Sequence, residues 1–241
     1  MFPLLQLTQT EPGVSGSSLM WGVFIILTLL SILASKSVER KFKRYAKIPT
    51  RHNLTGHEVA EQMLAAHNIR DVEVHIVKGT LTDHYNPTNK TLNLSPDVYN
   101  GTSVAAAAVA AHECGHAIQH ATSYRWLAMR SALVPVVSIT NRWVSWVLLA
   151  GLILVNAIPS LLLVGIGLFA VSTLFSIITL PVEINASRRA LAWVRQEGIT
   201  GPDTHQYAES ALRSAAYTYI IAAITSLATL LYYLMIYLDR R

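Results

Sequence analysis

Four stretches of the chain are apolar over roughly 20 residues each, which is enough helix to cross the hydrocarbon core of a bilayer. They cover residues 18–35, 134–157, 160–180 and 215–238, and polar segments separate the first from the second and the third from the fourth. Only a short turn joins the second stretch to the third. The pattern therefore predicts four transmembrane helices, the middle two forming a hairpin.

The first apolar stretch has the length of a signal peptide but lacks two of its features. Its basic residues follow the apolar part instead of preceding it, and no A-x-A cleavage site ends it. We therefore expect residues 1–35 to be a retained N-terminal segment and first transmembrane helix.

The polar segment between residues 50 and 131 predicts a small α+β portion. Helices are predicted over residues 56–66 and 104–121, strands over 72–77 and 91–95, and a turn or loop over 83–87. Thr55 and Glu58 have the spacing of a capping box for the first helix, and Ser103 is a candidate N-cap for the second. Pro96 is expected to end the second strand.

The composition agrees with a membrane protein that carries a polar portion. Of 241 residues, 52% are apolar and only 14% are charged, whereas soluble domains carry roughly 25% charged residues. The net charge of +5 fits basic residues that contact lipid headgroups, and no nucleic-acid-binding pattern appears. The single cysteine, Cys114, excludes a disulfide framework and a four-cysteine zinc site.

The distribution of basic residues predicts the orientation in the cell membrane. No Lys or Arg precedes the first span, whereas seven lie between residues 36 and 51. The positive-inside rule then places the N-terminus outside and residues 36–133 and 181–214 in the cytosol. Among the 19 basic residues, only Arg240 and Arg241 are expected outside.

Residues 112–116, His-Glu-Cys-Gly-His, form an H-E-x-x-H motif within the predicted Ala-rich helix. Residues four apart share a helix face, so His112 and His116 can bind one zinc ion. Glu113 projects beside that ion, where it can take a proton from a zinc-bound water and pass it to a leaving amine. Two satisfied core histidines and a surface glutamate are the alternative interpretation.

A catalytic zinc usually has three protein ligands, so a third ligand is needed. His120 lies eight residues from His112, about 12 Å along the helix axis, which is too far for one zinc ion. Glu183 follows the hairpin that returns the chain to the side of the histidines, and small residues share its helix face. The alternative is that Glu183 belongs to a charged membrane-edge helix with Arg188 and Arg189.

Two blocks carry a family resemblance: HECGHAIQ at residues 112–119 and PVEINASRRAL at residues 181–191. With the four spans, they resemble the YugP-type membrane zinc metallopeptidases, a family of neutral zinc metallopeptidases. The pattern E-x-x-A after a membrane hairpin is also distantly similar to HtpX-type and CAAX prenyl proteases. The resemblance implies a gluzincin-like site with one Zn²⁺ per chain and Glu183 as third ligand. Those distant relatives usually have Asp after the Ala; Ser187 replaces it here and is expected to orient a histidine only weakly.

Several other residues have two open interpretations. Gln119 and His120 either line the site or lie on the helix surface. Arg188, with Arg189, either stabilises an oxyanion or binds lipid phosphate. Residues 91–95 form either an edge strand that pairs with a peptide or an ordinary sheet strand. Cys114 is expected to be a small buried residue.

These observations predict a mainly α, multi-pass membrane protein with about four transmembrane helices and a small zincin-like α+β catalytic portion. Its expected parts are residues 1–35, a cytosolic portion over 36–133, the hairpin over 134–180, a cytosolic helix over 181–214, and the last span over 215–241. The predicted activity is zinc-dependent hydrolysis of membrane or membrane-proximal proteins near the cytosolic bilayer surface. The alternative is a non-proteolytic, zinc-stabilised membrane scaffold or assembly factor. A homo-oligomer and an accessory membrane partner are both compatible with the sequence.

Overall fold

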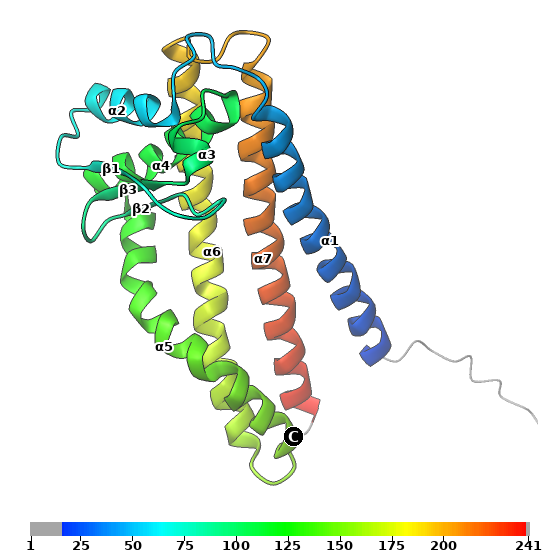
Figure 1. The fold of residues 1–241 in the computed structure, drawn as a ribbon. Helices are drawn as coiled ribbons and strands as arrows, with labels where there is room; N and C mark the ends of the chain where they lie inside the picture. Colours follow the sequence, from blue (N-terminus) through cyan, green and yellow to red (C-terminus); the bar gives the residue numbers. More distant parts are fainter. Residues whose placement is uncertain (1–15, 240–241) are drawn as a thin grey trace, which may run out of the picture.

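The computed structural model describes residues 16–239, which form four long helices with a small α+β portion packed at one end (Figure 1). The helices are α1 (Gly16–Tyr45), α2 (Gly56–Ala66), α3 (Pro96–Tyr99), α4 (Val104–Ala121), α5 (Arg125–Ile153), α6 (Pro159–Gln196) and α7 (His205–Asp239), and the strands are β1 (Glu73–Ile76), β2 (His84–Asn86) and β3 (Thr91–Leu94). Residues 1–15 of the predicted N-terminal segment, and Arg240 and Arg241, lie outside the described part.

Helices α1, α5, α6 and α7 are each long and apolar enough to cross a membrane. Large apolar side chains are exposed along them; Ile153 is 71% and Trp146 is 68% exposed. A soluble monomer rarely exposes contiguous apolar surface of this extent, whereas lipid tails cover such surface well. The fold is thus that of a mainly α, multi-pass membrane protein, as predicted.

Helix α6 continues through Pro181 without a break and has 38 residues. Proline removes one backbone hydrogen bond but is tolerated in a long membrane helix whose neighbours support it. The predicted hairpin and the predicted cytosolic segment with Glu183 therefore share one continuous helix. Its close packing against α5 is clearest at Gly151 of α5, where a Cβ would lie 2.6 Å from the Cα of Leu162.

Helix α4 lies at the centre of the α+β portion, and 14 of its 18 residues are buried. Half of these are alanines, whose small side chains allow α2, α6 and α7 to pack closely around it. Both predicted caps are present: Thr55 and Glu58 form a capping box on α2, and the Ser103 side chain accepts a hydrogen bond at the start of α4.

The small sheet has the strand order β1-β3-β2, with β1 parallel and β2 antiparallel to β3. The two predicted strands are confirmed, but the turn predicted over residues 83–87 contains β2. Three residues are too few to show an alternating pattern, and β2 exists because it pairs with β3. The predicted strand over residues 91–95 is central, so its interpretation as an edge strand is wrong. The edge near α4 is β2.

Candidate metal centre

The candidate site forms where α4 and α6 touch. A Cβ on Gly115 of α4 would lie 2.7 Å from the carbonyl oxygen of Ala186 in α6. Only glycine permits this approach of two backbones. Ala186 and Ala190 are fully buried on the facing side of α6. The small residues on the Glu183 face thus bring α6 against the histidine helix, as the sequence predicts.

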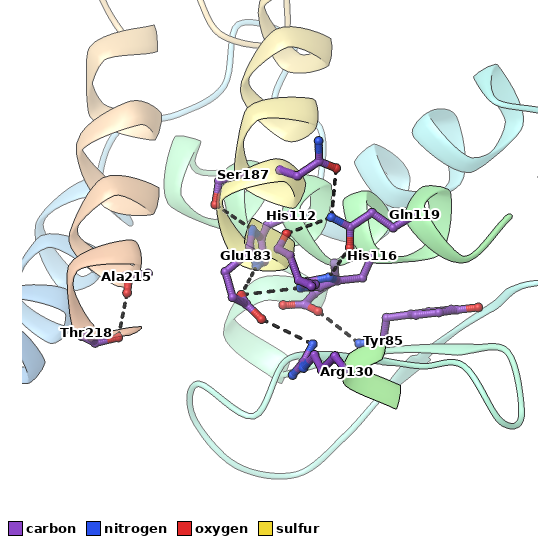
Figure 2. Close-up of polar contacts among 12 residues, drawn as sticks. Tyr85, His112, His116, Gln119, Arg130, Glu183, Ser187, Ala215 and Thr218 are labelled. Carbon is purple, nitrogen blue, oxygen red and sulfur yellow. Dashed lines mark hydrogen bonds and ion pairs between the residues drawn. The ribbon is translucent and has the colours of Figure 1, made fainter. Parts of the chain in front are cut away.

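Three donor atoms converge across this contact. The Glu183 Oε2 atom lies 3.3 Å from His112 Nε2 and 3.7 Å from His116 Nε2. Figure 2 shows the two histidines of α4 turned toward Glu183 of α6. Within the described residues, the buried Glu183 Oε2 atom makes no hydrogen bond of acceptable geometry. This oxygen and the two imidazole nitrogens thus form a group that could hold one metal ion.

The arrangement fits a zinc ion. The ligand atoms of these three residues all lie within 4.8 Å of one another. Ligand atoms of a tetrahedral zinc site, at bond lengths near 2.0–2.1 Å, lie about 3.3 Å apart. Two imidazoles and one carboxylate are also a common ligand set for a zinc ion that keeps one position open for water.

Gln119 fixes the ring of His116. Its Nε2 atom donates to the Val182 carbonyl at 2.8 Å and to Asn185 Oδ1 at 3.0 Å, so its Oε1 atom must accept from His116 Nδ1 at 3.1 Å. His116 then carries its proton on Nδ1 and presents the lone pair of Nε2 to the site. Gln119 is therefore adjacent to the site and fully buried, not on the helix surface.

Ser187 contacts the other histidine, with its Oγ atom 3.1 Å from His112 Nδ1 (Figure 2). Accepting the Nδ1 proton would leave His112 Nε2 free as a ligand atom. A hydroxyl is a weaker partner than a carboxylate, because the bond is not charge-assisted on the acceptor side.

Glu113 lies beside the three candidate ligands without joining them. Its Oε2 atom accepts a hydrogen bond from the Tyr85 backbone N–H of β2 at 3.1 Å, which orients the carboxylate. Burial raises the pKa of neighbouring Asp83, the two hydrogen bonds from Ser95 oppose that shift, and the charge of Glu113 adds to it. Asp83 and Glu113 line one cavity together with Glu183, and this cavity is about 230 Å³ in volume.

Comparison with known proteins identifies the family. The family model described as "Putative neutral zinc metallopeptidase" matches residues 20–238. The chain belongs to this family. It is also 40% identical over 225 residues to "Putative membrane protease YugP" of Bacillus subtilis (strain 168), a match that covers 91% of this chain and 98% of the relative. No solved structure matches the chain significantly. The resemblance carried by the two motif blocks is confirmed.

Two residues beside the candidate ligands were not predicted. Arg130 of α5 lies with Nη1 3.4 Å from Glu183 Oε1, the carboxylate oxygen that faces away from the histidines. Tyr219 of α7 lines the same cavity. Arg130 follows the motif by fourteen residues and Tyr219 lies in an apolar span, so no spacing rule connects either of them to zinc ligation.

Other candidates lie away from the three ligands. His120 is exposed, and its Nδ1 atom lies 2.8 Å from the Tyr85 hydroxyl. Arg188 is exposed and lines none of the cavities that contain Glu113. Cys114 is fully buried, and burial raises the pKa of its thiol well above the ordinary range, as expected for a small core residue.

Proposed function

We propose that this protein is a membrane-embedded, zinc-dependent endopeptidase. The observation that carries the proposal is the convergence of His112, His116 and Glu183 beside a carboxylate, Glu113, that is not one of the three. A purely structural zinc site usually has four protein ligands and needs no neighbouring base. The membership of the family and the similarity to a protein named as a membrane protease support the same conclusion.

In this proposal, His112, His116 and Glu183 would hold a zinc ion, which would supply Lewis-acid activation of the scissile carbonyl and of the attacking water. Glu113 accepts a proton from that water and returns it to the leaving amine. The Tyr85 N–H holds the Glu113 carboxylate in place, and Gln119 and Ser187 hold the histidine rings. Arg130 balances the buried charge of Glu183.

We further propose that the site lies at the cytosolic surface of the bilayer. Glu183 lies about 36 Å along α6 from Pro159, which exceeds the roughly 30 Å of the hydrocarbon core. The basic residues after the first span favour the cytosolic side. Substrates would then be membrane proteins or their cytosolic segments.

Metal analysis and peptide cleavage test the proposal. We expect Glu183→Ala to lose zinc, and Glu113→Gln to keep zinc while cleavage falls by several orders of magnitude. Full zinc occupancy in a folded Glu183→Ala protein would remove Glu183 from the site. Near-normal cleavage by Glu113→Gln would exclude it as the general base. Zinc retention without any cleavage by the wild-type protein would instead indicate a zinc-stabilised scaffold.

A further inference from the structure

A second cavity, which we call the apolar pocket, adjoins the candidate metal centre. It has a volume of about 150 Å³ and shares His112, Glu113, Asp83 and Tyr219 with the cavity of the candidate ligands. Its apolar lining comes from three helices and a loop: Val38 and Phe42 of α1, Leu81 between β1 and β2, Val109 of α4, and Ala211, Leu212 and Ala215 of α7. None of these seven apolar residues is a candidate metal ligand, whereas His112 at the pocket edge is one.

The size and lining of the apolar pocket suit one apolar side chain. A cavity of about 150 Å³ with mostly apolar walls is large enough for a benzene-sized apolar group. The two carboxylates at its edge, Glu113 and Asp83, disfavour an acidic group there. A leucine, isoleucine or phenylalanine side chain satisfies both conditions.

Leu81 connects this pocket to a larger space. Its side chain is 46% exposed, and its backbone φ of 57° is a left-handed conformation that bulky residues rarely adopt. Leu81 and Phe42 line both the apolar pocket and a cleft of about 1310 Å³ next to the end of α1. An extended chain that lies in the cleft can therefore reach Glu113 past these two side chains.

We propose that the apolar pocket binds an apolar side chain of the peptide substrate next to the scissile bond, with Leu81 and Phe42 as its outer wall. This proposal rests on the endopeptidase function above and adds its selectivity. The enzyme then prefers Leu, Ile or Phe at one position flanking the cleaved bond and rejects Asp and Glu there.

A peptide series tests the preference with the zinc-loaded, full-length protein. The peptides differ in one residue at each position around the cleavage site. We expect kcat/KM to fall by about tenfold or more from Leu to Ala at a single position, because a hydrophobic pocket discriminates by about that factor per missing group. Asp at that position should be cleaved more slowly still.

Filling the pocket gives a matched pair of variants on α7. Ala215→Leu places extra volume in the apolar pocket, whereas Ala216→Leu makes the same change at a neighbouring residue outside its lining. We expect Ala215→Leu to shift the preference from Leu to Ala, with about a tenfold loss for the Leu peptide. Ala216→Leu should keep the wild-type preference.

Leu81→Asn removes the wall by a second route. Asparagine tolerates a positive φ, so this change relieves backbone strain while it deletes the apolar side chain. We expect thermal stability to be kept or raised while the ratio of Leu to Asp cleavage falls. If Leu81 had only a structural role, the substitution would change the thermal stability but leave the ratio of Leu to Asp cleavage unchanged.

A binding measurement distinguishes the proposed pocket from the proposed chemistry. The zinc-loaded Glu113→Gln protein should bind the uncleaved Leu peptide more tightly than the Ala peptide, because the apolar lining is unchanged. Its discrimination against Asp should be smaller than that of the wild-type protein, because one of the two carboxylates at the pocket edge is gone. Cleavage with no preference at any flanking position would contradict the pocket proposal and leave the endopeptidase proposal intact. A preference that Ala215→Leu leaves unchanged would have the same meaning. Absence of both cleavage and binding across the series would overturn both. If the wild-type protein binds the Leu peptide more tightly than the Ala peptide but cleaves neither, the result would support an apolar binding pocket and contradict the endopeptidase proposal.

Discussion

At the scale of single residues, the hydrogen bonds behind the two histidines matter as much as the histidines. Gln119 holds His116 through an amide whose orientation is fixed by two acceptors on α6. Ser187 holds His112 through one hydroxyl. Partners of this kind typically contribute a factor of 10–100 to metal affinity. The two histidines therefore depend unequally on α6, and His112 has the weaker support.

We expect Ser187→Ala to weaken zinc binding by about tenfold, because His112 loses the partner of its Nδ1 atom. Competition with a chelator of known affinity measures this change. Ser176→Ala is the matched control on the same helix, since its hydroxyl donates to the Ser172 carbonyl one turn earlier and, among the described residues, not to a histidine. Equal zinc affinity in the two variants would show that Ser187 does not orient His112.

At the scale of secondary-structure elements, the contact between α4 and α6 assembles the site. Gly115→Ala would push a methyl group into the backbone of Ala186, and neither helix can yield without moving a candidate ligand. Overpacking of this kind costs about 1–3 kcal/mol. We expect Gly115→Ala to lower both thermal stability and zinc content, measured on purified protein by a melting curve and by metal analysis.

Gly167→Ala is the control for that prediction. Gly167 also lies within a helix, α6, but a Cβ there meets no atom of residues 16–239 within 4 Å. Alanine has the higher helix propensity, so this variant should be neutral or slightly more stable. A Gly115→Ala protein that matches Gly167→Ala in stability and zinc content would mean that the close approach of the helices is not needed.

Much of this arrangement is predictable from the sequence, and the exceptions share a cause. Helix α4, its Ser103 cap and the spacing of His112 and His116 depend on near neighbours, which local patterns encode. The strand β2 depends on pairing with β3, and Arg130 reaches Glu183 only after α5 and α6 have packed. Tertiary contacts of this kind leave no periodic signal in a single sequence.

At the scale of the whole molecule, the orientation in the membrane is open to a direct test. Ile158 lies in the turn between α5 and α6, and Thr88 lies in the exposed turn between β2 and β3. In a Cys114→Ala background, we expect a membrane-impermeant thiol reagent to label Ile158→Cys on intact cells and not Thr88→Cys.

The opposite labelling pattern would show that the protein has the inverse orientation in the membrane. The zinc proposal would survive, because it requires only that α4 and the end of α6 lie on one side. The proposed cytosolic substrates would not survive. Labelling at both positions would contradict the membrane hairpin itself.

The continuous helix α6 also has a consequence for biosynthesis. A ribosome releases His112 and His116 first, and Glu183 follows only after both arms of the α5–α6 hairpin. His112 and His116 alone form an incomplete set of zinc ligands. A nascent chain therefore completes the proposed metal site only after the hairpin has crossed the bilayer. Insertion of the hairpin would thus be a required step in the maturation of the proposed metal site.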